Sequence, residues 1–156
     1  MDLSGWTLRK ALELALSMER KSIELYTSAQ TKALSSSSIR LLKELVREEQ
    51  KHRNKIQEAM KDPKKTKEIG QPVTKIQDLK IVDYLEDTTL SPEADYQQIL
   101  IYAGKREKET HDLYIELAGR YRGRQIGKMF VQLAEEELKH KHRLEKEYDD
   151  TVLKYM

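Results

Sequence analysis

The sequence predicts an all-α protein, an antiparallel four-helix bundle in which one long crossover joins two helical hairpins. Three observations support this prediction. Apolar residues recur at helical spacing in four segments of the 156-residue chain. Only 6 Gly and 3 Pro interrupt the backbone, so long helices can form. The pattern of the first half returns in the second half at an offset of 88 residues, and a chain of this length suits a single domain.

The first hairpin is expected to consist of helices at residues 7–34 and 38–61. The serine tract at residues 35–38 interrupts the apolar pattern and can cap the second helix. Asp62 ends that helix, because a residue before proline avoids helical geometry and Pro63 follows.

The crossover is expected at residues 63–91 and the second hairpin at residues 92–119 and 125–152. A helix of about 25 residues is about 37 Å long. An extended linker of this length reaches up to about 95 Å, so it can cross the whole bundle. Ser91 and Pro92 predict the start of the third helix, with a capping hydroxyl and a proline at the first helical position.

Composition and charge exclude several classes of protein. A net charge of +2 gives no strong attraction to nucleic acid or to a membrane surface. The absence of Cys excludes disulfides, thiol catalysis, and zinc or iron–sulfur sites with Cys ligands on this chain. No segment resembles a membrane span or a signal peptide. We therefore expect a cytoplasmic protein that binds neither nucleic acid nor membrane.

Charged side chains interrupt the apolar stripes at matching positions of both hairpins. Glu137 and His140 continue an apolar series in the fourth helix, and Glu49 and His52 do the same in the second. One further Glu lies on the apolar face of each remaining helix. The repeat thus places six ionisable side chains in one core: Glu19, Glu49, His52, Glu107, Glu137 and His140.

Such a cluster predicts a site for two metal ions. Four buried carboxylates repel one another and lose hydration, at a cost of several kcal/mol each, and two divalent cations would neutralise them. In Glu-x-x-His the two side chains share a helix face, so the His can bind one metal while the Glu bridges both. A single such motif is more often a solvated helix face. Here both motifs follow their partner Glu by 30 residues, which favours the metal site.

With these ligands the chain resembles ferritin-like di-iron proteins of the rubrerythrin type over nearly its whole length. The resemblance implies two iron ions, although manganese also suits carboxylate and imidazole ligands. It makes Glu19 and Glu107 terminal ligands and the other two carboxylates bridges, with one His on each metal. Tyr26 and Tyr114 would donate hydrogen bonds to ligand carboxylates, the alternative being a role as core aromatics.

The chain departs from the rubrerythrin pattern in two respects. Thr110 stands where rubrerythrins typically carry a further Glu, which takes part in the family's redox-linked iron movement and so bears on peroxidase activity. The rubredoxin-like domain common in the family needs Cys, which is absent, so electrons would come from a separate donor protein. His111 could be an extra ligand or a proton donor, or a partly exposed packing residue.

The function predicted from these features is a di-metal redox protein that reacts with O₂ or H₂O₂ as a ferroxidase, oxidase or peroxidase. The alternatives are a subunit of an iron-storage cage and a helical interaction module that binds no metal. Manganese catalase shares the bundle, whereas hemerythrin needs more His ligands than the 4 His of the chain can provide. A homodimer is expected by resemblance and because Trp6, Leu16 and Ile101 would need cover.

Overall fold

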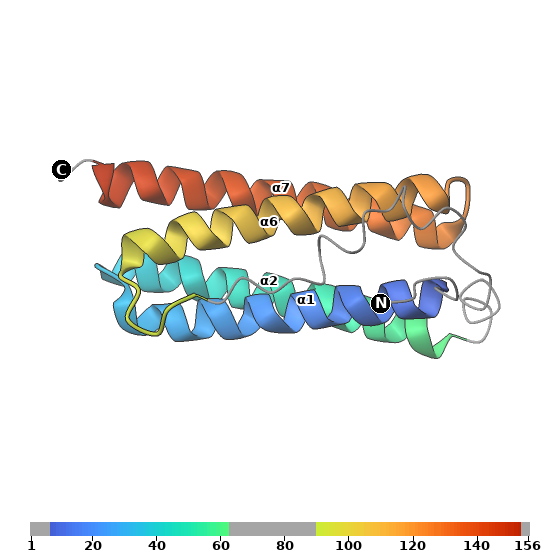
Figure 1. Cartoon of the computed structure of the whole chain (residues 1–156), viewed down its shortest axis with the longest axis horizontal. Coiled ribbons are helices and arrows are strands. Elements are labelled where there is room, and N and C mark those ends of the chain that lie inside the picture. Colours follow the sequence, from blue (N-terminus) through green and yellow to red (C-terminus); the bar gives the residue numbers. More distant parts are fainter. Residues whose placement is uncertain (1–6, 63–89, 154–156) are drawn as a thin grey trace.

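The computed structural model describes residues 7–62 and 90–153, and it confirms the predicted all-α four-helix bundle (Figure 1). The described residues contain no strand. A short 3₁₀ helix, η1 (Gln30–Lys32), follows the first of the long helices. The long helices are α1 (Leu8–Ala29), α2 (Ser36–Lys61), α6 (Tyr96–Arg120) and α7 (Gln125–Thr151).

The helices form two antiparallel hairpins. Helix α1 packs chiefly against α2, and α6 packs chiefly against α7. Helix α2 ends and α6 begins at opposite ends of the bundle, as a single long crossover between the hairpins requires (Figure 1). Residues 63–89, which are nearly all of the predicted crossover, lie outside the described residues.

Two helix ends differ from the prediction by more than two residues. Helix α1 ends at Ala29, because η1 and the extended backbone at Ala33 follow it. Helix α6 begins at Tyr96, so the prediction that Ser91 and Pro92 start it is wrong. Asp95 is the cap: its carboxylate accepts a hydrogen bond from the Gln98 backbone, and the Gln98 side chain accepts one from the Asp95 backbone.

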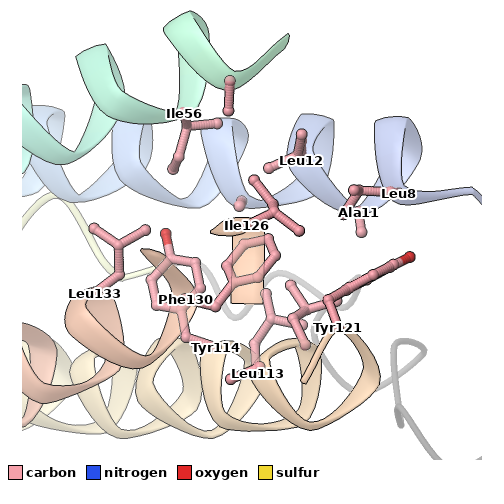
Figure 2. Packing of buried hydrophobic residues seen from close by; sticks show 14 of the residues in the cluster. Leu8, Ala11, Leu12, Ile56, Leu113, Tyr114, Tyr121, Ile126, Phe130 and Leu133 are labelled. Carbon is pink, nitrogen blue, oxygen red and sulfur yellow. The ribbon is translucent and has the colours of Figure 1, made fainter. Parts of the chain in front are cut away.

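The core consists of two apolar clusters separated by a polar layer. The first cluster joins the start of α1 and the end of α2 to the second hairpin's turn, and the other lies at the opposite end of the bundle. In the first cluster Phe130 lies between Tyr114 and Tyr121, with ring centroids 6.0 and 6.5 Å away (Figure 2). Each helix contributes to both clusters, so the middle of every helix faces the polar layer.

The surface bears on the expected homodimer only in part. Leu16 is only 9% exposed and belongs to the core, so the expectation that it needs cover is wrong. Ile101 is 43% exposed, and Trp6 lies outside the described residues. Among the described helices, none combines the length and apolar character that crossing a membrane requires.

Candidate metal centre

The six predicted ligands meet in the polar layer between the two apolar clusters. All six residues are buried, with no more than 2% of the surface of any residue exposed. Their ligand atoms form two groups, and the atoms within each group lie within 4.8 Å of one another. One group is Glu19, Glu49, His52 and Glu137; the other is Glu49, Glu107, Glu137 and His140.

Helix geometry explains why these residues meet. Glu49 and His52 are three residues apart on α2 and therefore share its inner face, as Glu137 and His140 do on α7. Helices α1 and α6 supply the remaining two carboxylates from the opposite side of the layer. Because Glu49 and Glu137 belong to both groups, they occupy the positions from which a carboxylate can bridge two ions.

Both imidazoles point their Nδ1 atoms at the carboxylates. His52 Nδ1 lies 2.8 Å from Glu137 Oε1 and 3.1 Å from Glu49 Oε1. His140 Nδ1 lies 3.1 Å from the same Glu49 oxygen. The rings stack with centroids 5.6 Å apart. Each imidazole can therefore bind an ion through Nδ1, while its Nε2 atom faces outward.

Two tyrosines connect the hairpins across the layer. Tyr114 on α6 donates a hydrogen bond of 2.6 Å to Glu19 Oε1 on α1. Tyr26 on α1 donates one to Glu107 Oε1 on α6. Each phenol thus holds one oxygen of a carboxylate from the opposite hairpin and leaves the other oxygen of that carboxylate for a different partner.

The unpaired atoms of the layer fit a pair of cations. Among the described residues, four buried carboxylates keep five oxygens without a hydrogen-bond donor, and one imidazole nitrogen is also unpaired. A buried acceptor without a partner is costly, and negative oxygens facing one another increase that cost. Oxygen and imidazole ligands suit iron or manganese. The unpaired atoms are Glu19 Oε2, Glu49 Oε1, Glu49 Oε2, Glu107 Oε2, Glu137 Oε2 and His140 Nδ1.

Burial and mutual repulsion raise the pKa of two of the carboxyl groups. Burial and the charge of Glu49 raise the pKa of Glu19 to about 7. Burial and the charge of Glu107 raise the pKa of Glu137 well above its usual value. Burial opposes the charged form of Glu49 as well, but the two imidazoles beside this carboxylate outweigh the effect of burial and lower its pKa to about 2.

The pKa values of both imidazoles are raised, although burial alone would lower them. Burial lowers the pKa of His52, but the bond to Glu136 and the nearby carboxylates of Glu19 and Glu49 raise it overall to about 12. Burial also lowers the pKa of His140, but the nearby carboxylates of Glu107 and Glu49 raise it overall to about 10. Without metal, protons on these groups therefore supply the positive charge that the carboxylates need.

The outer edges of the imidazoles reach a surface pocket of about 280 Å³. His52 Nε2 donates to Glu136, and His140 Nε2 lies 3.2 Å from Glu48 Oε2. Glu48 and Glu136 each precede a ligand Glu by one residue, and the sequence alone favours surface charges or charges that contact the ligands. Their repeat by 88 residues was the signal that they act as a pair. The pocket is lined by Glu48, Lys51, His52, Lys55, Glu136, Lys139, His140 and Arg143.

The two remaining predicted residues lie beside the layer. Thr110 is buried, but its hydroxyl donates to Arg106 O, 2.9 Å away on its own helix. His111 is half-buried, and its Nδ1 lies 2.8 Å from Ala134 O on α7. His111 belongs to neither group of ligand atoms. The structure thus gives His111 a contact that joins α6 to α7.

Comparison with known proteins agrees with the geometry of the layer. A family model described as Rubrerythrin matches residues 10–91 and 98–155, which is most of the chain. No curated protein and no solved structure matches this chain. Rubrerythrins typically hold two metal ions on carboxylate ligands, and the buried Glu and His groups described above could do the same. The chain belongs to the rubrerythrin family.

Proposed function

We propose that this protein is a di-iron redox protein that reacts with O₂ or H₂O₂. The observation that carries the proposal is that two buried groups of ligand atoms share Glu49 and Glu137. Shared carboxylates would hold both ions in one site, where a single oxidant could reach them. Manganese is the second candidate, because the ligand set suits both metals.

Each ion would have three carboxylates and one imidazole. Glu19 and His52 would hold one ion and Glu107 and His140 the other, with the shared carboxylates between them. Bound iron(II) would supply electrons for the oxidant and Lewis acidity toward its oxygen atoms.

The chain's own groups orient the ligands and limit the access of water. Burial and the charge of Glu19 hold the pKa of Tyr114 well above its ordinary value, so its phenol keeps its proton and remains a donor to Glu19. Tyr26 acts likewise on Glu107. The two apolar clusters close the layer at both ends of the bundle. The pocket over the imidazoles would be the route for ions and small oxidants.

The first test is metal content. Protein from iron-replete cells, or metal-free protein loaded with Fe(II) without oxygen, should hold about two ions per chain by mass spectrometry. Glu137→Ala should lose both ions, because Glu137 belongs to both groups. Glu135→Ala is the matched control, since Glu135 is exposed on the same helix. Wild-type protein that binds no metal would instead support the interaction-module alternative.

The second test concerns the reaction and the assembly. Loaded protein mixed rapidly with O₂ or H₂O₂ should oxidise about two Fe(II) per chain, and the faster oxidant identifies the physiological one. A separate donor protein would then supply the electrons that reduce the oxidised iron. Size-exclusion chromatography should give a homodimer, with twice the 18.3 kDa of the chain. A large hollow shell would favour iron storage instead.

A further inference from the structure

The two imidazoles differ in the carboxylate that supports their outer nitrogen. His52 Nε2 on α2 donates to Glu136 on α7, which is 32% exposed. Among the described residues, no other cation lies within 4 Å of that carboxylate. Glu136 therefore supports the His52 ring without a direct ion pair to another cation among the described residues.

The equivalent carboxylate at the other imidazole is shared. His140 Nε2 lies 3.2 Å from Glu48 Oε2, and Arg143 Nη1 donates to the same oxygen at 2.7 Å. Arg143 is held in place by a second bond to Glu44. The guanidinium thus neutralises the carboxylate that faces His140, and its bond is shorter than the imidazole's.

The sequence explains why the repeat is broken at this point. Residues 88 apart pair Arg143 with Lys55 and Glu44 with Gln132. Lys55 adds positive charge near Glu136. Gln132 stands at the position that corresponds to Glu44, so Lys55 has no equivalent of the acidic residue that holds Arg143 in position. The cation therefore bonds directly to the outer carboxylate in one half of the repeat only.

The outer carboxylate affects how strongly an imidazole binds metal. A carboxylate that accepts the Nε2 proton fixes the tautomer in which Nδ1 is free for metal, and it makes the ring more basic. The ligands themselves do not distinguish the two groups, since each has one phenol-bonded Glu, one His and the same two shared carboxylates. The outer contacts are therefore the main difference between them.

We propose that the two metal positions are unequal, and that the group containing His52 fills first because Glu136 positions and polarises its imidazole. Glu136 is a positioning residue in this proposal, which rests on the proposed function. Glu48 has the same place at His140, but Arg143 weakens its effect. Metal binding should consequently occur in two resolved steps.

The direct test uses the wild-type protein. One equivalent of Co(II) is added to metal-free protein, and anomalous scattering from crystals locates the ion. The expected result is predominant occupancy among Glu19, Glu49, His52 and Glu137. Equal occupancy, or predominance at His140, would overturn the inference and leave the proposed function intact. A protein that binds no Co(II) at either position would overturn the proposed function as well.

Variants test the cause of the inequality. Glu136→Gln keeps an oxygen acceptor but removes the charge, and it should weaken the first Co(II) step about tenfold. Glu48→Gln should change the second step less, because Arg143 already neutralises that carboxylate. Arg143→Gln should tighten the second step by freeing Glu48. The control Glu135→Gln, at an exposed position, should change neither step.

The titrations are followed by Co(II) absorbance, with circular dichroism of the metal-free variants as the check on folding. Glu136 and Glu48 are both partly exposed, so the bundle should tolerate either substitution. Equal effects of Glu136→Gln and Glu48→Gln would overturn the assigned role of Glu136.

Discussion

At the scale of single residues, the phenol of Tyr114 determines which oxygen of Glu19 is left for a metal. The bond to Oε1 leaves Oε2 as the unpaired atom that faces the other ligands. Tyr26 does the same for Glu107 from the other hairpin. The two bonds hold the carboxylates of Glu19 and Glu107 in place and also connect the two hairpins. Each phenol oxygen therefore contributes both to the site and to the fold.

Removing the Tyr114 hydroxyl should therefore destabilise the protein. We expect Tyr114→Phe to lower the free energy of unfolding by about 1–3 kcal/mol, the cost of leaving a buried acceptor unpaired. Tyr121→Phe is the matched control, because both rings pack on Phe130 (Figure 2). Among the described residues the Tyr121 hydroxyl has no hydrogen-bond partner, so its loss should cost little. Equal losses in urea unfolding would contradict the argument.

Sequence periodicity could predict which residues approach one another, but not all of their bonds. The steps of three and four residues along each helix place Glu137 and His140 on the inner face, and both residues are buried in the structure. The bond of Arg143 to Glu48 could not be predicted in this way. It depends on the conformation of a long side chain on the helix surface, where no apolar pattern restricts it.

At the scale of helices, the start of α7 depends on a close approach to the end of α6. A Cβ atom on Gly127 would lie 2.1 Å from Tyr121 O, a backbone atom that accepts a hydrogen bond from Arg124 N. We expect Gly127→Ala to destabilise the protein by about 1–3 kcal/mol, as overpacking does. Gly104→Ala is the control, since no atom lies within 4 Å of its added Cβ and a helix gains up to about 1 kcal/mol from this change. Thermal unfolding should shift in opposite directions for the two variants, and a shared direction would contradict the packing argument.

Helix boundaries illustrate a further limit of the sequence. Two start signals lie close together before α6, one at Ser91 and Pro92 and one at Asp95 with Gln98. Both signals are used locally: the first forms a turn in which Ser91 O accepts from Ala94 N at 3.0 Å, and the second caps the helix. Local chemistry permits either start, and the packing of Tyr96 and Ile99 into the core accompanies the second.

At the scale of the whole molecule, the proposed function requires protons and metal ions to compete for the same buried charge. The metal-free layer contains imidazoles whose pKa values are raised to about 12 and about 10, and a Glu19 carboxyl whose pKa is raised to about 7. All three groups bind protons more tightly in the folded protein than in the unfolded chain. The stabilisation from those protons is therefore lost as the pH rises.

The metal-free protein should lose stability between pH 5 and pH 9. Glu19 contributes to the loss from pH 4.5 to about 7, and His140 contributes from 6.5 to about 10. The lowered pKa of Glu49 acts only below pH 4.5, outside this window. Metal-loaded protein should show the opposite slope up to about pH 6.5, because its ligands are deprotonated while the unfolded chain still binds protons. Thermal melts of both forms at several pH values check this, and parallel slopes would contradict it.

Metal binding should also release protons, and the raised pKa values determine the smallest number released. Because the pKa values of the two imidazoles are raised to about 12 and about 10, each ring carries a proton on both nitrogens at pH 7 in the metal-free layer. The Nδ1 atom of each ring must lose its proton before it can hold an ion. Two ions should therefore release at least two protons per chain, and more where Glu19 and Glu137 are protonated. Calorimetric titration with Mn(II) in buffers of different ionisation enthalpy measures this number. Release of fewer than two protons would mean that the imidazoles are neutral before the metal arrives, and that cations do not replace protons in this layer.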